Sequence, residues 1–213
     1  MCFVMTASIT RCWKSARPER ALLWCLLFWC LGTASIASGQ HAELQSLRVE
    51  RTDDGVFLTA RVDFSLPAVV EDALTKGIPI HFVAEADISR ERWYWTDQQI
   101  AEAGRYMRVA YQPLTRRWRL NTSSEPLANT GLGVSLAQQY DSLNEVIAAV
   151  SRIPRWKIAS ASEIDVGGRQ FLRFRFRLDQ SQLPRTFQIG AAGQSDWVIS
   201  VERRLDLTQE SVR

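Results

Sequence analysis

Residues 170–178 alternate apolar side chains with three arginines, Arg173, Arg175 and Arg177. Successive side chains of a β-strand point to opposite faces, so the three guanidinium groups would form a row with a spacing of about 7 Å. Such a row can bind phosphate, a sulfated or carboxylated sugar, or an acidic protein. The alternative is cross-strand pairing, which is usual on the outer face of an antiparallel sheet. The acidic residues available for it are Asp63, Glu85, Asp87, Glu202 and Asp206.

A second set of candidate binding residues combines arginine with tryptophan, the types enriched at binding hot spots. Its members are Arg90, Arg92, Trp93, Trp95, Arg117, Trp118 and Arg119. Trp93 and Trp95 would share one face of a strand, so the alternative is a core pair with Tyr94 at the rim.

The carboxylates of Glu85 and Asp87 would also share a strand face. Paired carboxylates can act as acid and base in glycoside hydrolysis. They are equally ordinary surface residues of a strand, and the arginine row is an obvious partner for them. Because no further motif accompanies the pair, we predict no catalytic residue here.

Nucleophilic and metal-binding residues are scarce. All four cysteines lie within the first thirty residues, and the only histidines are His41 and His81. No nucleophile elbow, P-loop or dinucleotide fingerprint is present. We therefore predict no metal site and no cofactor, and a protein that is not an enzyme.

Short strands with a period of two dominate the chain. They are expected at residues 44–51, 56–66, 80–95, 105–112, 118–121, 156–160, 170–178 and 197–207. Residues 98–103 are compatible with an extended run or a helical turn, and residues 121–133 resemble a loop. Short helices are expected after Pro67 and after Ser142, which forms a capping box with Glu145.

This pattern predicts a mainly β fold, an antiparallel β-sandwich of immunoglobulin-like type with two short helices. A mixed α+β arrangement is the alternative. Nothing alternates strand and helix regularly enough for a parallel sheet.

The first 39 residues have the layout of a secretory signal peptide. Basic residues precede an apolar run at 21–31, and small residues follow. Cleavage is expected after Ala37 or Gly39, with Met1 or Met5 as the start. The alternative is an uncleaved anchor over residues 21–37 that would hold the protein at the inner membrane. Residues 40–213 would then form a single domain.

Removal of the leader changes the charge of the chain. The leader takes four of the 26 basic residues (Arg11, Lys14, Arg17 and Arg20) and one of the 23 acidic residues (Glu19), which leaves 22 of each. A neutral domain gives no reason to expect a nucleic acid or an anionic membrane as partner.

Five segments together resemble a known protein family. They are LQSLRVERTDDGVFLTARVDFSLP, ALTKGIPIHFVAEADISRERWYW, RYMRVAYQPLTRRWRL, SLNEVIAAVSRIPRW and FRFRLD. The pattern is similar to the proteobacterial domain-of-unknown-function family 4390, over residues 44–207. The resemblance implies an exported protein that faces the cell envelope, and an accessory role beside a sensor kinase.

We therefore expect an exported, non-catalytic accessory or binding protein of the periplasm, possessing a site for an envelope or membrane protein such as a sensor kinase ectodomain. One alternative is a carboxylate-based enzyme that acts on envelope carbohydrate. Another is a structural protein anchored in the membrane.

Overall fold

The computed structural model describes residues 42–91, 97–126, 136–164, 169–187 and 197–207. The chain divides into two compact units, Met1–Ser38 and Gly39–Arg213, and every described residue belongs to the second. The predicted signal peptide lies outside the described residues. No helix in the described part of the chain has the length and apolar character needed to cross a membrane.

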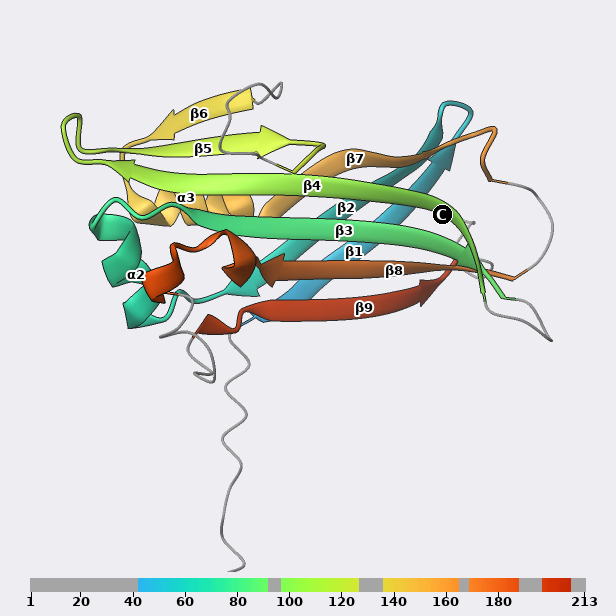
Figure 1. Ribbon diagram of the computed structural model, residues 1–213. Coiled ribbons are helices and arrows are strands. Elements are labelled where there is room, and N and C mark those ends of the chain that lie inside the picture. Colours follow the sequence, from blue (N-terminus) through green and yellow to red (C-terminus); the bar gives the residue numbers. More distant parts are fainter. Residues whose placement is uncertain (1–41, 92–96, 127–135, 165–168, 188–196, 208–213) are drawn as a thin grey trace, which may run out of the picture. The chain divides into compact units, whose positions relative to one another are not determined.

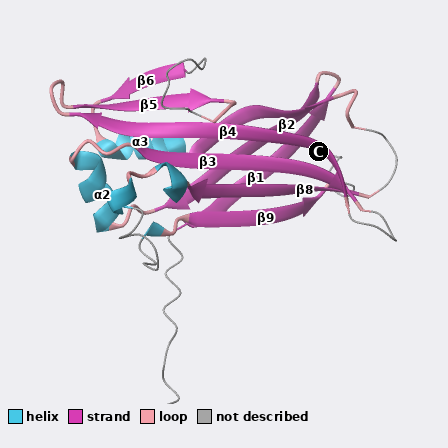
Figure 2. Ribbon diagram, in the orientation of Figure 1, coloured by secondary structure: helices cyan, strands magenta, loops and turns pink. Residues whose placement is uncertain are grey.

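Two antiparallel sheets make up this unit (Figures 1 and 2). One has the strand order β1-β2-β7, and its strands are β1 (Ala42–Thr52), β2 (Gly55–Phe64) and β7 (Arg152–Ser160). The other has the order β6-β5-β4-β3-β8-β9. Its strands are β3 (Ile80–Arg90), β4 (Gln98–Gln112), β5 (Arg117–Ser123), β6 (Leu136–Tyr140), β8 (Gln170–Leu178) and β9 (Ser200–Asp206). The predicted antiparallel sandwich is confirmed.

Short helical segments accompany the sheets. They are α2 (Ala68–Thr75), α3 (Leu143–Val150) and the 3-10 turn η1 (Gln180–Gln182). One half of the capping box predicted for α3 forms: the Ser142 hydroxyl accepts a hydrogen bond from the Glu145 backbone N–H at 3.2 Å, which satisfies an amide that a helix start leaves without a partner. The Glu145 carboxylate accepts from the backbone N–H of Asp141, one residue before the cap, instead of from that of Ser142.

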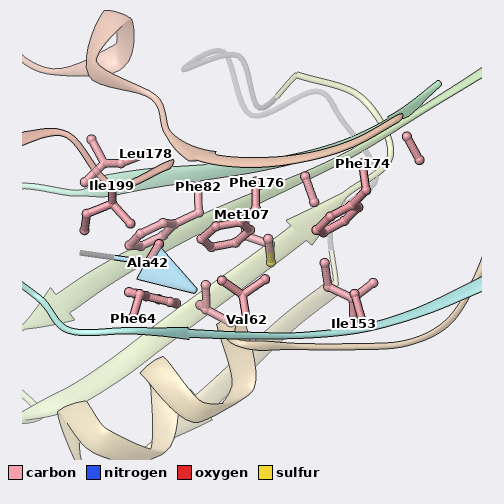
Figure 3. Packing of buried hydrophobic residues seen from close by; sticks show 14 of the residues in the cluster. Ala42, Val62, Phe64, Phe82, Met107, Ile153, Phe174, Phe176, Leu178 and Ile199 are labelled. Carbon is pink, nitrogen blue, oxygen red and sulfur yellow. The ribbon is translucent and has the colours of Figure 1, made fainter. Parts of the chain in front are cut away.

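Alternate residues of the strands fill the space between the sheets. Figure 3 shows Val62 and Phe64 of β2 facing Phe82, Met107 and Phe176 of the six-stranded sheet. The rings of Phe64, Phe82 and Phe176 lie with centroids 5.4 to 5.8 Å apart. Phe82 and Phe176 are fully buried. The core therefore fixes which face of β3 and β8 is turned outward, and with it the position of the arginine row.

The hairpin between β1 and β2 depends on a glycine. Asp53 and Asp54 form the predicted turn, and Gly55 follows with a φ of 138°. A side chain at this position would also meet the carbonyl oxygen of Ala159 on β7. Glycine is the residue that tolerates both the conformation and the close approach.

For residues 98–103 the sequence left an extended run or a helical turn open; they are extended and continue β4, because they pair with the far end of β3. Three other segments differ from the sequence-based expectation. β6 was not expected, and residues 121–123 belong to β5 instead of a loop. β7 begins at Arg152 and includes Pro154, which an edge strand tolerates because its outward N–H groups need no partner in the sheet.

Candidate binding surface

The three arginines of β8 lie on the outer face of the six-stranded sheet. The inward positions between them are occupied by buried Phe174 and Phe176, so the strand alternates as predicted. In the register, Arg173, Arg175 and Arg177 face β3 on one side and β9 on the other. Their side chains are 41%, 37% and 38% exposed, which makes them a half-exposed row on the strand next to the edge strand β9.

Carboxylates from both neighbouring strands bind this row. Glu85 of β3 accepts from Arg177 at 2.9 Å and from Arg175 at 3.4 Å. Glu202 of β9 pairs with Arg175 at 3.3 Å and with Arg173 at 3.6 Å. Asp179 lies 3.7 Å from Arg177. We call these residues, Arg173, Arg175, Arg177, Glu85, Asp179 and Glu202, the arginine ladder.

Cross-strand pairing, one of the two interpretations of the arginine row, is therefore observed for Glu85 and Glu202. It does not involve Asp63, which lies in the other sheet and accepts a hydrogen bond from Gln45. A row neutralised in this way has no free charge for a single small anion. Each guanidinium group nevertheless has five N–H donors, more than these contacts use, and holds them in a fixed orientation.

The neighbours of the ladder extend the ordered face. The guanidinium carbon of Arg204 lies 3.6 Å from the centroid of the Phe171 ring, a cation–π contact. Arg169 pairs with Glu91 and Asp206, each at 3.6 Å.

Glu85 and Asp87 share the outer face of β3, as predicted, but their environments differ. Glu85 is 20% exposed and is bound by two guanidinium groups. Burial, together with the nearby Glu102 and Glu85, raises the pKa of Asp87, and Arg173 and Arg175 only partly oppose this. Neither carboxylate lines either of the two cavities described below.

The Arg–Trp cluster predicted from the sequence is brought together only in part. Arg92, Trp93 and Trp95 lie outside the described residues, and Arg90 is half-buried at the end of β3. Arg117 is exposed and pairs with Asp141 at 3.1 Å. Arg119 is exposed and donates to the side chain of Asn121 at 3.1 Å.

The prediction that Trp118 contributes to a binding surface is corrected by the structure. Its side chain is 6% exposed and packs on Tyr111, with ring centroids 4.8 Å apart. The alternation of β5 places Trp118 and Leu120 inward, and it leaves Arg117 and Arg119 outward.

His81 was expected in mid-strand, but it is the second residue of β3; its side chain is buried. It borders a small cavity of about 30 Å³ beside Tyr106 and Asp179. Burial and the charge of Arg108 lower the pKa of this histidine, so the imidazole is held neutral. Neither ring nitrogen has a hydrogen-bond partner among the described residues. His41 lies outside the described residues.

A second charged region, which was not predicted from the sequence, lies on the outer face of the three-stranded sheet. Arg61 of β2 lies opposite Arg152 of β7, and Lys157 lies opposite Phe57. Arg155 places its guanidinium carbon 4.7 Å from the Phe57 ring centroid. We call the cations Arg61, Arg152, Arg155 and Lys157 the basic flank. Pro154 interrupts the alternation of β7, which hid this strand face in the sequence.

A groove of about 470 Å³ adjoins the basic flank between β2 and α3. Arg61 and Arg152 line it, with apolar side chains that include Leu66, Leu143 and Ile147. Asp63 and Glu71 also line it. The groove therefore combines an apolar wall with charges of both signs.

Comparison with known proteins identifies a family and no function. No curated protein and no solved structure matches the chain. One family model, described as a domain of unknown function (DUF4390), matches residues 39–205, which include nearly all the described strands. The chain therefore belongs to the DUF4390 family.

Proposed function

We propose that this protein is an exported, non-catalytic binding module of the periplasm that docks a partner protein on the arginine ladder. The observation that carries the proposal is the shared carboxylate of Glu85, which holds Arg175 and Arg177 at once. A side chain that is already fixed loses less conformational entropy on binding, so an ordered arginine row favours association.

The charge pattern supports a protein as the ligand. The ladder alternates guanidinium and carboxylate groups across β3, β8 and β9, so it complements a surface with charges of both signs. Complementary patterns of this kind give specificity and faster association more than raw affinity. A lone phosphate would have to displace Glu85 or Glu202 to gain full contact with the row.

Export is the second part of the proposal and is supported by the basic, apolar and small-residue segments of the N-terminus. It places the partner among envelope proteins with a periplasmic domain, such as a sensor kinase ectodomain. Mass spectrometry of the intact protein recovered from the periplasm tests this part. The expected mass lacks residues 1–37 or 1–39, and a full-length mass in the membrane fraction would indicate an anchored protein instead.

Site-specific photo-crosslinking in living cells tests the docking surface. A photoreactive amino acid at Ser200, an exposed position opposite Arg177, leaves every ladder residue in place. The matched control carries the same amino acid at Leu114, which is fully exposed. We expect one reproducible envelope protein to be captured from Ser200 and not from Leu114.

Replacement of all three ladder arginines by lysine then tests their role. Lysine retains the charge but lacks the planar fork of donors. We expect capture from Ser200 to fall about tenfold, given losses of about 0.5 kcal/mol at each of three contacts. Unchanged capture by a variant that melts at the wild-type temperature would refute docking on the ladder.

A further inference from the structure

The basic flank differs from the arginine ladder in its lack of acidic partners. Arg61, Arg152, Arg155 and Lys157 are all exposed. Within the part of the chain that the structure describes, none of them has a carboxylate oxygen within 4.0 Å, whereas every ladder arginine has at least one. Carboxylates do lie on this face without pairing with the flank: Glu50 stands opposite Phe57 on β1, and Asp63, two residues from Arg61 on β2, is hydrogen-bonded to Gln45.

Holding these cations together opposes folding. Arg61 and Arg152 are direct cross-strand neighbours, and like charges at such positions destabilise a sheet. Arg155 has a φ of 30°, in the left-handed region that residues other than glycine rarely adopt. Its backbone N–H donates to the Thr59 hydroxyl at 3.3 Å, and its guanidinium covers Phe57. Uncompensated charge and backbone strain at one place point to a binding role.

The groove limits what kind of ligand the flank can accept. It is a concave space of about 470 Å³ that begins at the Arg61–Arg152 pair and is bounded by Leu143 and Ile147 of α3. From Arg61 to Phe57 the strand rises by about 13 Å, so the cations continue away from the groove over that length. A ligand must therefore present acidic groups along an extended stretch and an apolar group at one end.

We propose that the basic flank and this groove bind an acidic segment of a partner polypeptide, whose apolar side chains enter the groove. Charge complementarity identifies the acidic character. Asp63 and Glu71 on the groove wall would repel a uniformly negative lipid layer. A polypeptide avoids this repulsion, because it can place apolar side chains in the groove and its acidic groups on the flank. The large apolar side chains that are exposed, Leu114, Leu136 and Val198, lie elsewhere in the described residues.

This inference goes beyond docking on the ladder, because the flank occupies the other sheet. Fluorescence anisotropy tests it with two labelled synthetic peptides, one alternating glutamate with leucine and one alternating glutamate with serine. Vesicles of phosphatidylglycerol serve as the lipid probe. We expect the purified protein to bind the glutamate–leucine peptide at least several-fold more tightly than the glutamate–serine peptide.

Two variants localise the site. Charge reversal of both flank arginines (R61E with R152E) should weaken binding of the glutamate–leucine peptide about tenfold, because it removes two attractive contacts and replaces them with repulsion. The matched control reverses two exposed arginines elsewhere (R185E with R203E) and should bind as the wild type does. Leu143→Ser should remove the preference for leucine over serine without changing net charge, even if the double reversal fails to fold.

The outcomes separate the alternatives. An equal loss in both double reversals would show that net charge alone causes binding, and it would overturn the site. Equal affinity for the two peptides would overturn the role of the groove. Binding of vesicles without binding of peptide, or binding of neither probe, would overturn the proposal.

Discussion

Replacement of Glu85 by glutamine tests whether the arginine ladder is a fixed structure. The substitution keeps the shape of the side chain and removes its negative charge. Hydrogen bonds to charged groups contribute about 1.5–3 kcal/mol when sheltered, whereas exposed ion pairs contribute about 0.2–1 kcal/mol. Glu85 is 20% exposed and its partners Arg175 and Arg177 are 37% and 38% exposed, so both pairs lie between these limits. We expect Glu85→Gln to lower the free energy of unfolding by about 1–2 kcal/mol and the melting temperature by about 4 °C.

Urea unfolding followed by circular dichroism measures this loss. Glu202→Gln is the matched control, because Glu202 also contacts two ladder arginines but is 52% exposed, at 3.3 and 3.6 Å. It should lose about 0.5 kcal/mol or less. A double-mutant cycle of Glu85→Gln with Arg177→Gln should give a coupling energy of about 0.5–1 kcal/mol. Equal losses for the two glutamates, or no coupling, would refute the argument that Glu85 fixes the row.

Three further predictions concern the core and two titrating groups. Phe176→Ala should lower the free energy of unfolding by about 3–5 kcal/mol, because it opens a cavity beside two other phenylalanine rings; a loss below about 1 kcal/mol in urea unfolding would contradict the packing. Burial and Arg108 lower the pKa of His81 in the folded protein, so this histidine binds a proton more readily in the unfolded chain. The free energy of unfolding should therefore be highest above about pH 6.5 and should fall as the pH is lowered below that value. His81→Leu should flatten that dependence in melts recorded across this range. Burial and Glu102 raise the pKa of Asp87, which means that its charged form destabilises the fold. Asp87→Asn should therefore raise the melting temperature at pH 7. This gain should shrink in melts at lower pH, where the wild-type carboxyl becomes protonated.

The fold could be predicted where a strand has one buried face. β2 and β8 alternate apolar and polar residues over most of their length, and their observed bounds match the expected ones to within two residues. β6 has an exposed side chain at almost every position and carries no alternation to detect. Its existence depends on pairing with β5, which is a property of the tertiary structure. Residues 98–103 were compatible with an extended run or a helical turn, and pairing with β3 determines that they are extended.

The candidate site was predictable in composition and only partly in arrangement. Alternation along β8 placed three arginines on one face, and the register then determined which carboxylates they meet. Glu85 lies opposite Arg175, whereas Asp63 belongs to the other sheet. The sequence alone does not show which of the two carboxylates shares a sheet with the arginines. Trp118 was assigned to the binding surface because tryptophan is enriched at interfaces, but this enrichment does not show which face of β5 is buried. The basic flank was hidden because its members come from two strands that are far apart in the sequence.

The two sheets balance their charges differently, and this difference constrains the function more than the net charge does. The outer face of the six-stranded sheet pairs each ladder arginine with a carboxylate, so a partner there gains specificity from a matching pattern. The flank on the three-stranded sheet leaves like charges opposite each other, so a partner there also relieves a repulsion that the folded chain otherwise retains. A domain that needed only a soluble surface would gain nothing from the second arrangement. The proposed binding of an acidic segment would account for the unpaired cations of the described basic flank, whereas a need for solubility alone would not.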